Sequence, residues 1–535
     1  MLHILKRKFS SSGSESIYKS LLYNNVKNIF MYKGYDTSFT NINSIVSNDE
    51  QNCGYSAIGY AKSSNKTGVI VSHKTGLTNM ITPILHSTNE STPLVLLSNM
   101  NTLETRKSTE ITKPYTKWSY CAKSGDNLYE LINKAFTVAN EGKKGSVHID
   151  LPKCILNDIN GENINFDKDN EKEKETDTDT DFIFLHEMIV NSKKPILYIG
   201  KGCNNDSKDL YKFAIKYNIY VTTTIHAMGV FNENHLLSLG MYELHVANHA
   251  IQNTDLIIAL GTTLGTTIGT TIGTISNISK YAPMCKNIIH VNIEESELAI
   301  DKVIDKCENT KVYKLHMECS TFLNKINNVY TEHNNVKRSV FCNKKVSYPA
   351  PNRFEWDKQI DEWKKVKIKI INDTINDTNK LNTQMFIEQI NKSINNKNTI
   401  ITSGVGNHQI LCAEFITWTQ PNQFITSLGL SYSIGVQIAN PDKIVINIDE
   451  DRYFNNTLVD LQTISRYQLP IKIFIINNSK ISIGTEYFFK PNYNLLALSY
   501  GIHTITIENK TELQRMIEYV LNYKDPIICN VKVQF

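Results

Sequence analysis

The sequence predicts an α/β protein of three domains, each built on a mostly parallel β-sheet with helices on both faces. Its 535 residues, 41% of them hydrophobic, are enough for about three separate cores. Near-continuous apolar runs such as PLVLLS, DLIIALG and KIVINID are typical of strands buried on both faces, and helical stretches separate them. The almost wholly polar stretch 167–181 cannot contribute to a core, so it divides the first domain from the second.

A second weakly structured stretch surrounds residues 348–351, where Tyr-Pro-Ala-Pro favours extended chain over helix. It separates the second domain from the third. The predicted organisation is a presequence or tail over 1–13, a first domain over 14–166, a charged linker over 167–181, a central domain over 182–332, a second linker over 333–357 and a third domain over 358–535.

Composition narrows the class of function. The net charge of +4 comes from 57 basic and 53 acidic residues that are interspersed, so no basic face favours nucleic acid as a partner. The ten cysteines lie far apart without a C-x-x-C spacing, which favours reduced thiols over a disulfide framework or a zinc site. No apolar run approaches the roughly 20 residues that cross a bilayer, so we expect no membrane-spanning helix.

The N-terminal residues bear on localisation only. The first twelve, MLHILKRKFSSS, combine apolar, basic and serine residues and contain no acid, as mitochondrial presequences do. The alternative is a disordered, mildly basic tail on a cytoplasmic protein.

Polar side chains follow two predicted strands of the third domain. The strand KIVINI runs into the charged residues 449–452, and the strand IKIFII ends at Asn478. Asp451 and Asn478, 27 residues apart, would present a carboxylate and an amide oxygen at the ends of two parallel strands. Such oxygens can hold an octahedral Mg²⁺ that keeps sites open for diphosphate oxygens. The alternative is an ordinary pair of strand ends with a capping Asp and a turn-forming Asn.

This spacing resembles the thiamine-diphosphate signature, Gly-Asp-Gly followed after a similar interval by Asn-Asn, with Asp451 as the acid and Asn478 as the second amide. In that family the third protein ligand of Mg²⁺ is a backbone carbonyl two residues on, which falls at Lys480. Both glycines are replaced, by Glu450 and Arg452. Arg452 could pair with a phosphate or simply occupy the space. Glu450 adds negative charge beside an anionic ligand, at a cost of about 1 kcal/mol or more if it points inward.

The first domain supplies the matching half of the resemblance. The stretch 49–61, DEQNCGYSAIGYA, is similar to the H-E-Q-x-x-x-x-A-A-x-G-Y-A helix start of the same family. Glu50 then falls on the glutamate that hydrogen-bonds the aminopyrimidine ring and promotes the tautomer that activates the cofactor. As a lone acid at a helix start, Glu50 would instead be a dipole-stabilising cap.

Further matches extend over most of the chain, including MYKGY at 31–35, HKTGLTN at 73–79 and GVGNHQ at 404–409. The chain is thereby identified as a divergent member of the thiamine-diphosphate-dependent enzymes, closest to the acetolactate synthase catalytic subunit. The resemblance implies pyrimidine-binding, central and diphosphate-binding domains. The cofactor-binding positions that it implies are Gly34, Gly76, Asn79, Gly406, Asn407, His408, Asp451 and Arg452.

Several details depart from the family. The glycine-rich loop after Ser427, which carries the residue that props the cofactor, is shorter here. The central stretch 261–275 is a Gly-Thr-Thr repeat without the basic residue that acetolactate synthases present to substrate. Gly200-x-Gly202 after a strand lacks a third glycine, so bound flavin or adenine nucleotide is not expected. His245 and His249 could share a metal on one helix, but surface or interface histidines are the better interpretation.

The resemblance implies a carboligase or decarboxylase that uses thiamine diphosphate and Mg²⁺ on pyruvate-like 2-keto acids. It implies a homodimer or tetramer, because the family's cofactor lies between the first domain of one subunit and the third domain of its partner. Two alternatives remain open. One is a catalytically inactive dimeric scaffold or interaction protein, and the other is an intact enzyme for a different 2-keto acid or acyl-CoA substrate.

Overall fold

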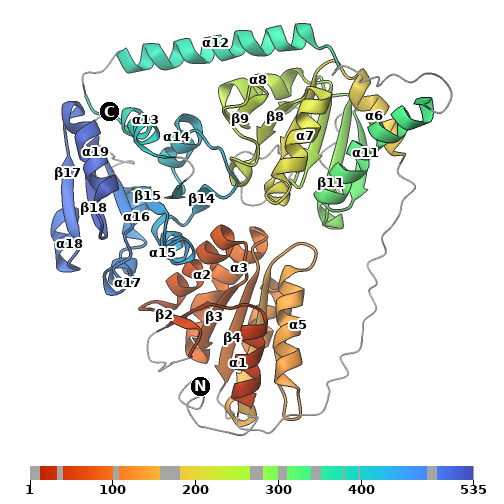
Figure 1. Ribbon diagram of the computed structural model, residues 1–535. Helices are drawn as coiled ribbons and strands as arrows, with labels where there is room; N and C mark the ends of the chain where they lie inside the picture. The colour runs from red at the N-terminus through yellow and green to blue at the C-terminus, as the bar shows by residue number, and fades with distance from the viewer. Residues whose placement is uncertain are drawn as a thin grey trace. The chain divides into compact units, whose positions relative to one another are not determined.

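The computed structural model describes residues 13–32, 40–100, 108–156, 181–264, 281–298, 310–338, 351–376, 380–395, 398–478 and 491–533. Figure 1 colours the first domain red to orange, the central domain yellow to green, and the third domain cyan to blue. Predicted site residues Gly34 and Lys480 lie outside the described residues, as do most of the presequence, the linker residues 167–180 and the repeat from residue 265 on.

Three six-stranded sheets confirm the predicted α/β fold (Figure 1). Their orders are β2-β1-β3-β4-β6-β5, β12-β11-β10-β7-β8-β9 and β14-β13-β15-β16-β18-β17. The strands of the first two sheets, and β13 with β15 to β18 in the third, run parallel to their neighbours. The strands of the first sheet are β1 Asn28–Tyr32, β2 Asn43–Ser47, β3 Gly68–His73, β4 Leu94–Met100, β5 Trp118–Cys121 and β6 Ser146–Pro152. Those of the second are β7 Pro195–Ile199, β8 Tyr220–Thr223, β9 Ser238–Met241, β10 Leu256–Leu260, β11 Asn287–Asn292 and β12 Lys311–His316. Those of the third are β13 Thr399–Gly404, β14 Phe424–Ser427, β15 Ile444–Glu450, β16 Lys472–Asn478, β17 His503–Ile507 and β18 Ile527–Val533.

Helices connect the strands in each domain. Two parallel strands must be joined by a crossover connection, and a helix forms most of these connections. In the first domain they are α1 Gly13–Tyr23, α2 Glu50–Ser64, α3 Ile81–Asn89, α4 Ser108–Thr112 and α5 Leu128–Asn140. In the middle of the chain they are α6 Phe182–Asn191, α7 Ser207–Tyr217, α8 His245–Asn253, α11 Cys319–Arg338, α12 Phe354–Asn376 and α13 Thr383–Ser393. The third domain has α14 Asn407–Phe415, α15 Gly429–Ala439, α16 Asp451–Asn455, α17 Asp460–Arg466, α18 Tyr493–Ser499 and α19 Leu513–Asn522.

The chain forms two compact units. The first unit contains residues 1–170, 398–409 and 425–535, and the second contains 171–397 and 410–424. The first and third sheets therefore belong to one unit although the whole central sheet separates them in sequence. Both ends of the predicted linker 333–357 are helical, because α11 reaches Arg338 and α12 begins at Phe354.

Two helices join the first and third domains inside the first unit. Helices α2 and α15 cross with their backbones almost touching, and glycines make this possible (Figure 1). A Cβ on Gly435 would overlap the carbonyl of Ser56, and a Cβ on Gly59 would overlap the backbone of Tyr432. One hydrophobic core spans both domains around this crossing. Only residues without a side chain permit so close an approach.

A buried polar cluster closes one side of the same crossing. Lys62 of α2, 8% exposed, forms an ion pair of 2.7 Å with Glu90 at the end of α3. Glu90 also accepts hydrogen bonds from Ser427 at 2.5 Å and from the Tyr432 hydroxyl at 3.0 Å. Removing one partner of such a buried pair costs about 3–5 kcal/mol, because the other charge is left without compensation. The start of α15 is therefore fixed to the first domain.

The glycines after β7 serve packing between strand ends in the central domain. A Cβ on Gly202 would lie 2.7 Å from the Cα of Gly261, and one on Gly200 would overlap the same segment. The turn is therefore filled by the chain's own backbone. The two histidines of α8 have ring centroids 4.6 Å apart, and His249 stacks on Trp363. Within the described ranges, no three His, Cys, Asp or Glu side chains converge as metal ligands would.

Among the helices that the structure describes, none is both long and apolar enough to cross a membrane.

Substituting Gly435 by Ala tests the helix crossing. An Ala would normally stabilise a helix interior by about 1 kcal/mol. Here its methyl group would collide with the Ser56 carbonyl, so we expect a loss of about 1–3 kcal/mol in the free energy of unfolding, measured by chemical denaturation. A gain in stability would contradict the crossing.

Asp460, buried at the start of α17, makes stability depend on pH. Burial raises its pKa from 3.8 to about 7, although the Ser431 hydroxyl donates to it at 2.5 Å. The unfolded chain releases this proton near pH 4, so the stabilisation from Asp460 is full below that pH and is lost as the pH rises to about 7.

We therefore expect the melting temperature to decrease as the pH is raised from about 5 to about 8. The decrease should be smaller in Asp460→Asn, because an asparagine cannot ionise. The exposed Asp442→Asn is the matched control and should behave as the wild type does. Equal pH slopes in all three proteins would refute the assignment.

Candidate cofactor site

The carboxyl ends of β15 and β16 lie side by side at one edge of the third sheet. The two strands pair in parallel with Glu450 opposite Ile476. Asp451 begins α16 directly after β15, and Asn478 ends β16, each with 3% of its surface exposed. The two residues that the sequence assigns to Mg²⁺ therefore sit at the ends of neighbouring strands, which is where ligands bind in open α/β sheets.

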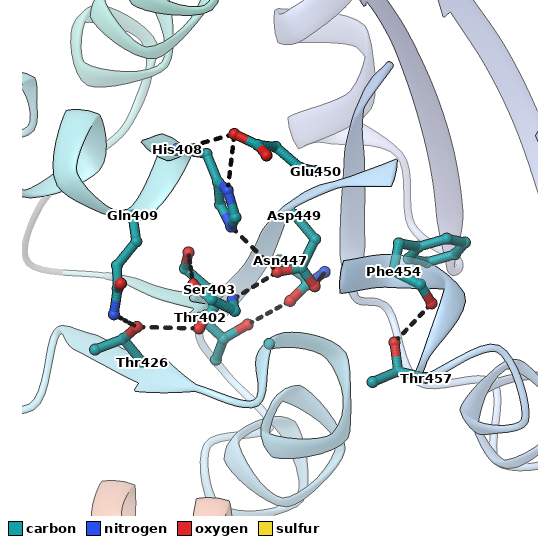
Figure 2. Close-up of polar contacts among 12 residues, drawn as sticks. Thr402, Ser403, His408, Gln409, Thr426, Asn447, Asp449, Glu450, Phe454 and Thr457 are labelled. Carbon is teal, nitrogen blue, oxygen red and sulfur yellow. Dashed lines mark hydrogen bonds and ion pairs between the residues drawn. The ribbon is translucent and has the colours of Figure 1, made fainter. Parts of the chain in front are cut away.

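His408 lies between two carboxylates at the same edge, and Figure 2 shows its ring pointing between them. The ring is fully buried, with Nε2 3.5 Å from Asp449 and Nδ1 3.4 Å from Glu450. The backbone N–H of His408 also donates to Glu450 at 3.3 Å. These ring distances are those of ion pairs rather than of well-formed hydrogen bonds.

Charge explains how these groups share one edge. Burial alone would lower the pKa of His408, but Asp449 and Glu450 outweigh it and raise that pKa to about 9. His408 is therefore a cation at neutral pH. In return, His408 lowers the pKa of the Glu450 carboxyl, against the effect of burial. The sequence predicts that the negative charge of Glu450 is costly, and the His408 cation at the start of α14 offsets it.

Asp449 is the centre of this arrangement. Its carboxylate accepts hydrogen bonds from the backbone N–H of Gly404 at 2.5 Å and from the Asn447 side chain at 2.8 Å. Gly429 begins α15 with φ of +33°, and a Cβ there would lie 2.6 Å from one Asp449 oxygen and closer still to the other. The carboxylate thus connects β13, β15 and the start of α15.

Hydroxyl groups extend the network beneath the site (Figure 2). Thr402 contacts the Ser433 hydroxyl at 2.5 Å and donates to the Asn447 amide oxygen at 3.1 Å. Gln409 donates to Thr426 at 2.5 Å. All these side chains except that of Gln409 are fully buried, so the network keeps β13, β14 and β15 in register.

Glu50 forms a second set of contacts within the first domain. Asp49 caps α2 by accepting from the Asn52 N–H at 2.9 Å, so Glu50 is the first helical residue. Asn79 donates to the Glu50 carboxylate at 3.2 Å. A Cβ on Gly76 would lie 2.7 Å from the Glu50 side chain. Three predicted site residues, Glu50, Gly76 and Asn79, are therefore brought together.

The predicted residues thus fall into two sets, one around Glu50 and one around His408. In the second set Gly406 lies against the His408 ring, where a Cβ would be 2.7 Å away. Asn407 and Arg452 are exposed at the starts of α14 and α16.

Three parts of the chain match models of the thiamine pyrophosphate enzymes. Residues 11–117 match the N-terminal TPP binding domain, 184–307 the central domain, and 404–531 the C-terminal TPP binding domain. Together these ranges cover about two thirds of the chain. The chain belongs to the thiamine pyrophosphate enzyme family.

Relatives of this thiamine pyrophosphate enzyme are similar along nearly its whole length. The mitochondrial acetolactate synthase catalytic subunit of Saccharomyces cerevisiae is 28% identical over 585 residues, covering 98% of this chain and 80% of that protein. The mitochondrial acetolactate synthase of Schizosaccharomyces pombe is also 28% identical, covering 98% and 83%. The chloroplastic acetolactate synthase of Arabidopsis thaliana is 25% identical, covering 97% and 81%.

The residues present fit the cofactor that the family binds, thiamine diphosphate with Mg²⁺. Asp451 and Asn478 offer hard oxygen atoms, the donors that Mg²⁺ prefers. The start of α14 offers backbone N–H groups and the His408 cation, which suit an anionic diphosphate. Both sets fall within the ranges that match TPP binding domains.

Sequence reasoning missed Asp449 and Asn447. Both lie in the strand KIVINID, where they alternate with apolar residues. This pattern could have identified them, because a polar side chain in a buried strand requires hydrogen-bond partners. It also did not foresee that Glu450 and His408 would pair.

Asp449→Asn tests the centre of the site. Two donors point at this carboxylate, and the NH₂ group of an asparagine would face one of them. His408 would also lose one of its two neighbouring negative charges. We therefore expect the free energy of unfolding, measured in urea, to decrease by about 2 kcal/mol or more. The exposed Asp442→Asn removes the same charge and should cost almost nothing. Equal stabilities would show that Asp449 does not organise this edge.

Proposed function

We propose that this protein is a carboligase or decarboxylase of the acetolactate synthase type that uses thiamine diphosphate and Mg²⁺ on pyruvate-like 2-keto acids. The main support is that Asp451 and Asn478 lie at the ends of adjacent strands, inside the part of the chain that matches a TPP binding domain. Similarity to acetolactate synthases over 98% of the chain supports the reaction type.

Each predicted residue takes a part in binding. Asp451 and Asn478, with the carbonyl of Lys480, would hold Mg²⁺. Gly406, Asn407 and His408 would face the diphosphate. Arg452, exposed in the first turn of α16, would pair with a phosphate oxygen.

The first domain would bind the pyrimidine end and move its proton. Glu50 would share a proton with the aminopyrimidine. Asn79 donates a hydrogen bond to the Glu50 carboxylate, and Gly76 leaves the space that the Glu50 side chain occupies. Gly34 would let the backbone approach the ring. When bound, thiamine diphosphate supplies the chemistry that releases CO₂ from a 2-keto acid and passes on the remaining unit.

We infer a homodimer or a tetramer, with each site shared between two subunits. The contacts described for Glu50 come from its own domain. A partner's third domain would complete the site. The N-terminal residues and the mitochondrial yeast relatives together support a mitochondrial location.

A second candidate is a scaffold that retains the fold without turnover. It is favoured by one observation, the Glu450 carboxylate at the edge where a diphosphate would bind. Binding and turnover measurements separate the two candidates.

The first test is calorimetric titration of the full chain with thiamine diphosphate and Mg²⁺. We expect saturable binding that Asp451→Ala abolishes, because the metal loses its carboxylate ligand. Glu50→Gln should retain binding but reduce turnover of pyruvate by about 10²–10⁴-fold. Binding without turnover in the wild type would favour the scaffold, and an absence of binding would refute the proposal.

Mixing two inactive variants tests the shared site. A hybrid dimer of one Glu50→Gln subunit and one Asp451→Ala subunit contains one site with both mutations and one site with neither. If sites span subunits, activity should return after the two proteins are unfolded together and refolded. If each site lies within one chain, the mixture should stay inactive, as each variant refolded alone would.

A further inference from the structure

The carboxylate of Glu450 lies where the start of a helix would bind an anion. Helix α14 begins at Asn407, and the N–H of its second residue, His408, donates to Glu450 at 3.3 Å. The first N–H groups of a helix have no partner within it, and they carry a partial positive charge that attracts phosphate or carboxylate groups. The chain's own side chain takes up this position.

The His408 ring gives an independent indication that a ligand belongs here. It is fully buried, yet neither ring nitrogen makes a hydrogen bond in the structure, and the nearest carboxylate oxygens are 3.4 and 3.5 Å away. A buried polar group normally has a closer partner. Gly406 leaves just enough space, since a Cβ there would lie 2.7 Å from the ring and 3.6 Å from Glu450.

The two carboxylates around His408 differ in how firmly they are held. Asp449 is fully buried and receives two further hydrogen bonds, from Gly404 and Asn447. The Glu450 side chain is 23% exposed, and its described hydrogen bond comes from the backbone of His408. Arg452, two residues on and exposed, is the other charge that acts on Glu450. Of the two acids, Glu450 is the one that can turn away.

We propose that Glu450 occupies the place of a phosphate group in the cofactor-free protein and must leave His408 when thiamine diphosphate binds. This rests on the proposed cofactor site. It makes Glu450 the residue that sets affinity for phosphate-bearing ligands. The carboxylate would compete with any anion at the start of α14, and it would not affect a thiamine that lacks phosphate.

Calorimetric titrations of the full chain in Mg²⁺ test this inference. The variants are Glu450→Gln, which preserves shape, and Glu450→Gly, which restores the residue that the family carries. Glu518→Gln, exposed on α19, removes the same charge from the same domain as a matched control. The ligands are thiamine diphosphate, thiamine and inorganic pyrophosphate, and thermal unfolding verifies that each variant is folded.

Both Glu450 variants should bind thiamine diphosphate and pyrophosphate about tenfold more tightly than the wild type, because a repelling charge is removed. Thiamine binding should not change, and Glu518→Gln should match the wild type. Unchanged or weaker binding of both phosphate ligands by the Glu450 variants would overturn the inference.

Pyrophosphate separates the failure of this inference from the failure of the proposed function. If no variant binds thiamine diphosphate but the Glu450 variants bind pyrophosphate more tightly, the anion site stands and the cofactor assignment fails. If thiamine diphosphate binds equally to all variants, the function stands and the inference fails. If neither ligand binds to any variant, both are refuted.

Discussion

A carboxylate buried at the end of a strand must be surrounded by donors, and Asp449 obtains them from several elements at once. Gly404 contributes a backbone N–H from the end of β13, Asn447 an amide from within β15, and His408 a positive charge from α14. Gly429 allows the start of α15 to pass against the same group. Asp449 itself lies at the edge where the cofactor would bind, so the geometry of that edge depends on satisfying one charge.

The same charge explains why a residue that departs from the family pattern is tolerated. A glycine is replaced by Glu450, which would be costly beside an anion. His408, made cationic by Asp449 and Glu450 together, provides a counter-charge for it. In the absence of cofactor the two carboxylates therefore share one cation. A glutamate in place of the family's glycine therefore adds a competitor for His408 and leaves the fold around it unchanged.

Much of the fold could be predicted from local patterns. The apolar runs PLVLLS, DLIIALG and KIVINID form β4, β10 and β15. Strands that are covered on both faces contain few polar residues, except where a hydrogen-bond partner is present. Asp451 and Asn478 could be assigned because they lie at the ends of two predicted strands, with a spacing that resembles the thiamine-diphosphate signature.

The contacts between distant segments could not be predicted in this way. Lys62 contacts Glu90 and Tyr432, and His408 contacts Glu450, only because segments from different parts of the chain pack together. The role of Gly59 and Gly435 could not be assigned from the sequence, since what they accommodate is another helix. Gly34 and Lys480 lie outside the described residues and stay predictions.

The union of the first and third domains in one core has a consequence for synthesis on the ribosome. The glycine face of α2, together with Lys62 and Glu90, is translated early, whereas its partners begin at residue 425. At about 5–20 residues per second, the ribosome needs roughly 20–70 seconds to traverse the intervening chain. For that time an apolar face with a buried-type ion pair is open to water. The apolar face of the nascent first domain is thus a surface that molecular chaperones would protect during translation.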